Sequence, residues 1–161
     1  RHTRLVSDWS SDVCSSDLGE ELEIVRRTTG MEQPTIEPVL TRAQVLRIQN
    51  LARAVPVAEH VLAYAVRLVR ATRPDDAACP AVLRPLLAYG ASPRASQCLV
   101  LSAKARAVLD GRPTVTIDDV RALAVATIAH RIVPSFRAEA EGMDGRKLVE
   151  RALQELPAPV D

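Results

Sequence analysis

The sequence predicts an all-α fold, a bundle of five to seven helices, from three observations. Apolar residues recur at the three- and four-residue spacing of amphipathic helices in several segments, and proline or glycine separates these segments. The alternating pattern of a strand is limited to the short stretch Thr114–Ile117. Hydrophobic residues make up 47% of the 161 residues but aromatic residues only 2%. The core of what is, by length, a single domain must therefore consist of Ala, Val, Leu and Ile.

Three helices are expected in the first half of the chain, where glycine, proline and a capping motif mark their ends. Gly30 ends the first helix, and a loop with two prolines follows. Thr41 and Gln44 have the spacing of a capping box, which predicts a second helix that continues until Pro56. The expected ranges are 20–28, 42–55 and 57–72. The apolar side consists of Val45, Ile48, Leu51, Ala52 and Val55 in the second helix, and of Val61, Leu62, Ala65, Leu68 and Val69 in the third.

The second half of the chain is expected to hold a short helical turn and three further helices. Ser92 suits the N-cap and Pro93 the first position of a long helix, which Gly111 closes. Thr116, followed by two acidic residues, predicts the start of the next helix, which should end before Pro134. The expected ranges are 83–89 for the turn and 93–110, 117–133 and 144–156 for the helices.

The charge balance and the cysteines argue against several classes of protein. Lys and Arg number 21 and Asp and Glu 20, a net charge of +1, which argues against a broad surface for nucleic acid or anionic membranes. No apolar run approaches the ~20 residues of a membrane span, and the first residues lack the apolar region of a secretory signal. Cys14, Cys79 and Cys98 are odd in number and widely spaced, so no disulfide framework is expected. A cytoplasmic protein with reduced thiols is the expectation.

Residues 1–18 differ in composition from the rest of the chain. They hold five of the nine serines and the single tryptophan, Trp9. This block resembles the translated read-through of a sequencing adapter, so we expect it to be foreign to the gene. It is therefore left out of the fold prediction, as residues added by a cloning vector would be. The expectation is a non-native, disordered stretch at 1–18 and one domain at 19–161, with the natural N-terminus lying upstream.

The usual catalytic and metal-binding patterns are absent from the sequence. The six glycines are scattered singly, and no G-x-x-x-x-G-K-[ST] loop precedes either lysine, so the chain has no phosphate-binding loop of its own. Two acidic pairs occur, Asp75-Asp76 and Asp118-Asp119, and the second lies in a first helical turn, where carboxylates complement the helix dipole. The cysteines and histidines lack the spacing of a zinc site, and Cys98 is expected to be a small core residue. No catalytic residue and no metal site are predicted.

One short motif, Gly90-Ala91-Ser92-Pro93-Arg94-Ala95, predicts a contact with a phosphate group. With Ser92 at the N-cap and Pro93 at the first position, Arg94 lies in the first turn of the long helix. Free backbone N–H groups, the positive end of the helix dipole and a guanidinium group converge there. The first turn of this helix is therefore the candidate binding site.

Residues Tyr89–Ala124, YGASPRASQCLVLSAKARAVLDGRPTVTIDDVRALA, resemble the lid subdomain of MoxR-type AAA+ ATPases. The matching motifs are the G-A-S-P-R-A core, the alanine-rich helix after it, the D-G-R turn and the T-x-D-D-V segment. The segments ELEIVRRTTG, AVPVAEHVLAYAVRLVRATRP and HRIVPSFRAEAEG also resemble the family, which extends the resemblance over 19–161. In the last segment Pro134, Ser135 and Arg137 depart from the family pattern, in which Asn and Glu flank the Phe.

The resemblance implies a helical bundle that folds over ATP, which is bound with Mg²⁺ to a separate core. Arg94 matches the family's second-sensor arginine, which reaches the nucleotide phosphates, and Ser92 and Pro93 shape the helix terminus that carries it. Walker A, Walker B and the arginine finger belong to the core, so the parent protein is expected to be a bacterial ATPase and this part alone to be inactive. The family typically forms homohexameric rings that couple ATP binding and hydrolysis to chaperone-like remodelling or maturation of partners, often proteins with a von Willebrand factor A domain.

A stand-alone helical module that binds protein or DNA is the alternative. The long helix followed by T-V-T-I-D-D-V loosely resembles histone-fold and helix-turn-helix bundles, and 19 of the 21 basic residues are arginines. Those arginines are interleaved with acidic residues, whereas duplex binding needs a basic face. Single-strand binding needs stacking aromatic rings, and only Tyr64, Tyr89 and Phe136 remain outside 1–18. Nucleic acid is therefore not an expected partner.

Overall fold

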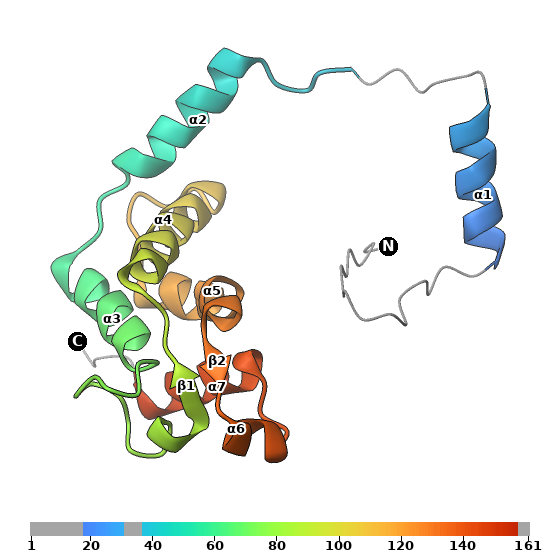
Figure 1. The fold of residues 1–161 in the computed structure, drawn as a ribbon. Helices are drawn as coiled ribbons and strands as arrows, with labels where there is room; N and C mark the ends of the chain where they lie inside the picture. The colour runs from blue at the N-terminus through green and yellow to red at the C-terminus, as the bar shows by residue number, and fades with distance from the viewer. Residues whose placement is uncertain (1–17, 31–36, 158–161) are drawn as a thin grey trace. The chain divides into compact units, whose positions relative to one another are not determined.

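The structure is a computed structural model that describes residues 18–30 and 37–157 (Figure 1). In these residues it contains seven α-helices, two short 3-10 helices and one two-stranded antiparallel sheet, so the predicted all-α bundle is confirmed. The chain separates into two units, Arg1–Leu40 and Thr41–Asp161. The stretch interpreted as adapter sequence, residues 1–18, lies outside the described residues except for Leu18.

The described residues of the first unit, 18–30 and 37–40, contain one helix, α1 (Leu18–Thr29), which is slightly longer than the expected 20–28. Glu20 and Glu21 lie in its first turn and two arginines lie in its last turn, so both ends carry the charge that complements the helix dipole. Arg27 Nε lies 2.7 Å from Glu23 Oε1, one helical turn earlier. None of its residues is buried, so local interactions define this helix.

The second unit holds all the remaining elements. Its helices are α2 (Arg42–Ala54), α3 (Glu59–Arg70), α4 (Pro93–Leu109), α5 (Ile117–Ile128), α6 (Phe136–Ala140) and α7 (Gly145–Glu155), and its strands are β1 (Leu87–Tyr89) and β2 (Val133–Pro134). The two 3-10 helices, η1 (Arg84–Leu86) and η2 (Ala129–Arg131), each lead toward one strand. In the described part of the chain, no helix is both long and apolar enough to cross a bilayer.

The core of the second unit is built around α4, which packs against α2, α3 and α5 (Figure 1). Its buried face consists of residues four positions apart that are fully shielded from solvent: Ala95, Leu99, Ala103 and Ala107. Three of these four side chains are single methyl groups, which lets neighbouring helix backbones approach closely. The rest of the core comes from the apolar faces of α3, α5 and α7, as the low aromatic content predicts.

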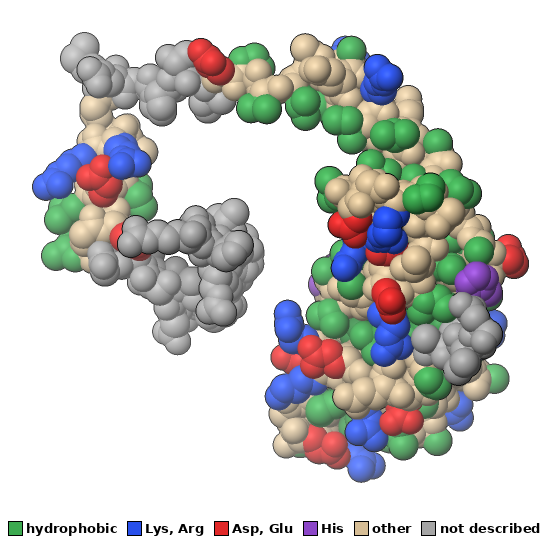
Figure 2. Space-filling view, turned by 180° about the vertical axis from the view of Figure 1, so that it is seen from behind, with side chains coloured by type: hydrophobic (Ala, Val, Ile, Leu, Met, Phe, Trp, Pro, Cys, Tyr) green, Lys and Arg blue, Asp and Glu red, His purple; other side chains and the backbone are tan. Residues whose placement is uncertain are grey.

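The helix α2 begins as predicted but presents its apolar side differently from the expectation. The capping box is confirmed: Thr41 Oγ1 accepts a hydrogen bond from Gln44 N at 3.3 Å, and Gln44 Oε1 accepts one from Thr41 N at 2.8 Å. None of its residues is buried, and Val55, just after the helix, is the buried residue of the expected apolar set. Figure 2 shows hydrophobic side chains along the surface of this helix. The exposed ones are Val45, Leu46, Ile48 and Leu51.

Two expected ranges, 83–89 and 117–133, are wrong where they meet the small sheet. The first contains the expected helical turn, as the 3-10 helix η1, but it then continues into β1. The second leaves the α-helix at Ile128 and reaches β2 through η2. The strands pair antiparallel, with Leu87 opposite Pro134 and Tyr89 opposite Val133 across an irregularity. Strands of two or three residues are too short to show alternation, and the alternating stretch Thr114–Ile117 forms no strand.

The structure gives each residue that departs from the family pattern a local role. Pro134 lies in β2, and Ser135 is the N-cap of α6, a helix that the sequence did not predict. The Ser135 hydroxyl accepts a hydrogen bond from Ala138 N at 3.2 Å and donates one to the carbonyl oxygen of Pro85 at 2.8 Å. Arg137 pairs with Glu141 one turn later at 2.9 Å. This segment therefore joins the start of α6 to η1.

Candidate functional site

The predicted site residue Arg94 lies in the first turn of α4, and its side chain is exposed. Ser92 occupies the N-cap with extended backbone angles, φ −74° and ψ 169°, and Pro93 is the first helical residue, as predicted. The Ser92 hydroxyl, however, accepts no capping hydrogen bond, so its expected capping bond is missing. The first turn contains no acidic residue. Among the residues that the structure describes, no side chain pairs with the Arg94 guanidinium. The positive charge of Arg94 and that of the helix terminus are therefore both uncompensated.

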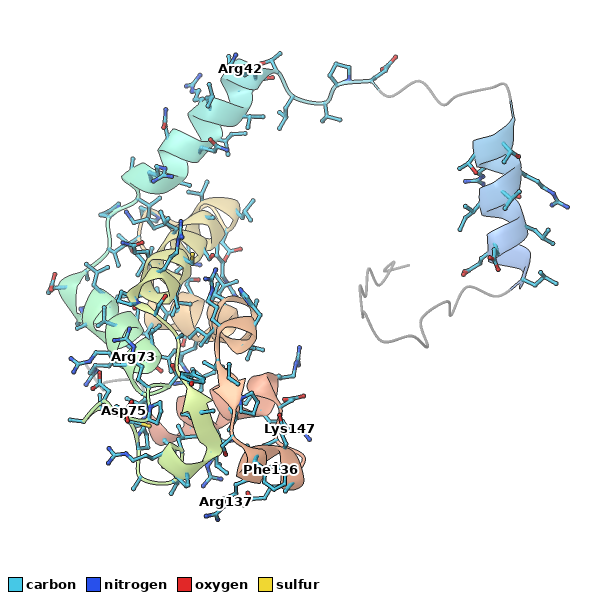
Figure 3. All side chains as sticks on the ribbon, viewed as in Figure 1. Arg42, Arg73, Asp75, Phe136, Arg137 and Lys147 are labelled. Carbon is cyan, nitrogen blue, oxygen red and sulfur yellow. The ribbon has the colours of Figure 1, made fainter. Side chains whose placement is uncertain are left out.

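Bonds from the end of α3 hold the residue that precedes this terminus. The buried Ala91 donates its backbone N–H to Thr72 Oγ1 at 3.1 Å and accepts a hydrogen bond on its carbonyl oxygen from Arg73 Nε at 2.7 Å. The Thr72 hydroxyl is itself buried and donates to the carbonyl oxygen of Val69 at 2.7 Å. Figure 3 shows Arg73 at the end of α3. Two consecutive side chains thus satisfy both backbone polar groups of Ala91.

Gly90 allows this contact because it has no side chain. A Cβ placed on Gly90 would clash with the carbonyl oxygen of Thr72 and lie 2.6 Å from the Cα of Arg73. The backbone of the loop can therefore lie directly against the end of α3 only with glycine at this position. This explains, in structural terms, the first residue of the G-A-S-P-R-A motif.

A shallow pocket of about 360 Å³ lies beside Gly90. Its lining residues are Arg73, Pro74, Asp75, Asp76, Ala88, Tyr89 and Gly90. The two aspartates differ in environment: Asp75 is exposed, whereas Asp76 accepts hydrogen bonds from Arg70 Nε at 2.8 Å and from Ala78 N at 2.9 Å. The bond from Arg70, together with that from Ala78, lowers the pKa of Asp76 to about 2. These bonds use Asp76 to order the loop after α3.

The second acidic pair marks the start of α5, at the end of α4 away from Arg94. Asp118 is exposed, and Asp119 forms the predicted first-turn interaction as the third residue of a capping box with Thr116. Thr116 N donates to Asp119 Oδ2 at 2.9 Å. Asp119 is buried and also accepts a hydrogen bond from Arg112 Nη1 at 2.8 Å. This carboxylate joins the start of α5 to the end of α4, where Arg106 Nε lies 3.3 Å from it.

The cysteines and histidines form no site in the described residues. No group of three or more His, Cys, Asp or Glu side chains there could hold a metal ion. Cys79 is a buried free thiol, and burial raises its pKa. Cys98 is only half-buried, so the expectation of a core residue is wrong, because it lies next to the core stripe of α4 and Arg131 Nη2 lies 3.7 Å from its sulfur.

Comparison with known proteins decides what this bundle is. Residues 80–152, which include the Gly90–Ala95 motif and the helices α4 to α6, match the AAA lid domain family. The chain carries an AAA lid domain. It is also 31% identical over 140 residues, 87% of its length, to "Chaperone MoxR1" of Mycobacterium tuberculosis, and 29% identical over 126 residues, 78% of its length, to "Uncharacterized protein YeaC" of Bacillus subtilis. The lid domain is thus related to MoxR-type AAA ATPases.

A solved structure supports the same relation. The chain resembles the crystal structure of a protein assigned as an ATPase from Cytophaga hutchinsonii, with a TM-score of 0.72 and 31% identity over 89% of this chain. The chain spans 44% of that protein and 37% of each of the two curated relatives. The lid domain therefore corresponds to less than half of these proteins.

The sequence did not predict that Thr72 and Arg73 hold the loop before α4 against the end of α3. Thr72 and Arg73 stand in the T-R-P stretch after a helix, which looks like any polar connection. Their partners on Ala91 are backbone atoms 18 and 19 residues later. Because backbone atoms are the same in every residue, the side chain of Ala91 gives no sign that Thr72 and Arg73 bind it. The singly placed Gly90 before Ala91 is the local sign of a close approach.

Proposed function

We propose that this chain is the lid of a MoxR-type AAA ATPase and that Arg94 contacts the phosphates of ATP bound to the core. The exposed, unpaired Arg94 in the first turn of α4, within an AAA lid domain, carries this proposal. Closing the lid brings a guanidinium group and a helix N-terminus to the nucleotide, where negative charge is greatest. Closure then couples ATP binding and hydrolysis to chaperone-like remodelling or maturation of a partner protein.

The lid by itself is expected to bind ATP weakly and not to hydrolyse it. A hydrogen bond between charged groups contributes about 1.5–3 kcal/mol, and a millimolar ligand requires about 4 kcal/mol. Arg94 together with a helix terminus barely reaches that value. The core would supply the phosphate loop, the Mg²⁺ ligands and the attacking water, so catalysis needs the whole protein.

The proposals for the assembly and the partners rest on the same relation. The relation to MoxR-type AAA ATPases supports a homo-oligomer, which we propose to be a hexameric ring in the bacterial cytoplasm, and proteins with a von Willebrand factor A domain are the proposed clients. On the face shown in Figure 2, basic and acidic side chains are interspersed rather than gathered into one basic surface. This distribution favours the lid over the alternative of a DNA-binding module.

The first test is a titration of the isotope-labelled 161-residue chain with ATP, followed by amide chemical shifts. The expected result is a millimolar affinity with shifts confined to the start of α4, lost in Arg94→Ala and kept in Arg137→Ala, an exposed arginine on α6. Micromolar binding, turnover above background, or shifts elsewhere with α4 unaffected would contradict the proposal. Nanomolar binding of duplex DNA at low salt would favour the alternative instead.

The second test restores a core. In a chimaera that joins the AAA core of MoxR1 to residues 19–161, Arg94→Ala should lower ATP hydrolysis about tenfold or more, because one donor to the developing charge is lost. Thermal unfolding of the chimaera should stay unchanged, since the side chain is exposed. Equal ATP turnover in the wild-type chimaera and in its Arg94→Ala variant would contradict the proposal and would mean that Arg94 is an ordinary solvated surface residue.

A further inference from the structure

The start of α4 lacks the side-chain cap that usually stabilises a helix N-terminus. Ser92 provides no side-chain cap, and Pro93 has no N–H group. One backbone bond closes the first turn, from Ala95 N to Ser92 O at 2.9 Å. The residue before the turn is held by the segment that follows α3, because the N–H and carbonyl groups of Ala91 bind Thr72 and Arg73 at 3.1 Å and 2.7 Å. The local bond shapes the first turn, and the tertiary contact sets where the turn begins.

We propose that Thr72 and Arg73 are positioning residues for Arg94, an inference that rests on the proposed function. They fix Ala91, and Ala91 is separated from Arg94 only by Ser92 and Pro93. Proline restricts one of the backbone angles in that short connection. The end of α3 and the first turn of α4 thus move as one piece, and Arg94 arrives at the phosphates in one orientation.

Three features distinguish this contact from ordinary packing. Thr72 is a buried polar side chain whose hydroxyl is fully used, as donor to Val69 O and as acceptor from Ala91 N. Arg73 uses its Nε on the backbone carbonyl of Ala91, and its charge also helps to lower the pKa of Asp76. The backbone of Gly90 lies so close to Thr72 and Arg73 that no side chain would fit at this position. A displacement of about 1 Å in a group that orients a reactant can lower the rate about 100-fold. A contact that sets the position of Arg94 should therefore have a large effect on the rate of ATP hydrolysis.

The substitution Thr72→Val tests the contact with little change in shape. Valine keeps the volume of threonine but cannot accept the Ala91 N–H, whereas Thr72→Ser keeps the hydroxyl and should behave as wild type. Arg67→Ala removes an exposed arginine of α3 that takes no part in the contact and is the matched control. In the 161-residue chain, amide exchange at Ala91 should accelerate at least tenfold in Thr72→Val only, with protection of α5 and α7 unchanged.

The decisive measurement is a double-mutant cycle on ATP hydrolysis by the chimaera. Thr72→Val and Arg73→Ala should each lower kcat by about fivefold or more, and neither should lower it further when Arg94→Ala is already present. Thr72→Ser, which keeps the hydroxyl, should hydrolyse ATP at the wild-type rate. Multiplicative effects in the double variants, or normal kcat in Thr72→Val while Arg94→Ala is slow, would overturn the positioning role and leave the proposed function standing. Normal kcat in Arg94→Ala would instead overturn the proposed function.

Amide exchange at Ala91 tests the contact without the AAA core of the chimaera. Unchanged exchange at Ala91 in Thr72→Val would overturn the contact itself, whatever the hydrolysis rate. General loss of protection across α5 and α7 would show that Thr72 stabilises the whole bundle rather than one loop, and this too would contradict the proposal.

Discussion

The carboxylate of Asp119 is buried and has several bonding partners. Its side chain is 3% exposed, and it accepts hydrogen bonds from Arg112 and from the N–H group of Thr116, while Arg106 Nε lies 3.3 Å away. The bond from Arg112 is the main cause that lowers the pKa of Asp119 to about 2, although burial opposes the shift. A single residue thus caps α5 and attaches it to the end of α4.

We predict a pH dependence of stability that originates at Asp119. Because its pKa is depressed in the folded state, its stabilising effect is present above the ordinary value of 3.8 and is lost as the pH falls toward 2. The difference in unfolding free energy between wild type and Asp119→Asn should therefore shrink by about 2 kcal/mol between pH 5 and pH 2. Chemical denaturation at a series of pH values measures it. Asp118→Asn, at the exposed neighbour, is the control, and a difference that stays constant with pH would contradict the assignment.

A second single-residue prediction concerns Tyr64, which the sequence did not identify as a core residue. Its fully buried hydroxyl donates to Leu156 O at 3.1 Å and accepts a hydrogen bond from Arg121 Nη1 at 2.6 Å. Tyr64→Phe should reduce the unfolding free energy by about 1–2 kcal/mol, because the Leu156 carbonyl and Arg121 each lose a partner. Tyr89→Phe, at a ring that is 72% exposed, should have no measurable effect. Equal stability of both variants in urea unfolding would contradict the role of Tyr64.

At the scale of elements, the buried stripe of α4 determines how closely the bundle packs. Ala95, Ala103 and Ala107 have no exposed surface, and α4 is in contact with helices on several sides. An interior packed to normal density has no room for an added isobutyl group. Small side chains are therefore a requirement of the packing here and not only a helix preference.

Replacement of one alanine in that stripe tests the packing. Ala103→Leu should destabilise the protein by about 1–3 kcal/mol through overpacking between α4 and its neighbours. Ala126→Leu, at an exposed position of α5, should stay within about 0.5 kcal/mol of wild type, because leucine is also a good helix former. Thermal unfolding compares the two. Equal melting temperatures for both variants would show that α4 is less tightly enclosed than its buried face indicates.

At the scale of the whole molecule, the buried core of the described residues lies in the second unit. The buried apolar residues of the described chain run from Val55 to Ala152, and α1 has none. The helix α2 adds contacts on α4 and a hydrogen bond from Lys104 Nζ to Arg53 O at 2.9 Å. Stability should therefore reside in the unit Thr41–Asp161.

Truncation measures this division. A protein that begins at Thr41 should unfold cooperatively with a melting temperature within about 2 °C of that of the full chain, because no core residue is removed. A protein that begins at Glu59 loses α2 and Val55 and should melt several degrees lower. A large loss of stability in the first truncation would mean that residues before Thr41 contribute to the core.

Local signals in the sequence were sufficient for the helices that begin or end with a defined motif. Thr41 and Gln44 form their capping box, Pro93 is the first residue of α4, and Gly111, with φ +67°, follows its end. Each of these depends on residues within one helical turn. The small sheet was not predictable in this way, because β1 and β2 are too short to show a pattern and their pairing joins residues about 45 positions apart.

The helical class, the alanine-rich core and the place of Arg94 in the first turn of α4 were predictable from the amino-acid sequence, since composition and periodicity act over neighbouring residues. What holds that turn, and which apolar faces are buried, became apparent from the folded chain alone. Ala91 is bound by Thr72 and Arg73 through backbone atoms, and the apolar side of α2 stays largely exposed although its spacing matches that of a buried face. Hydrogen bonds to the backbone and the number of neighbours around a helix are properties of the folded chain, and no single segment encodes them.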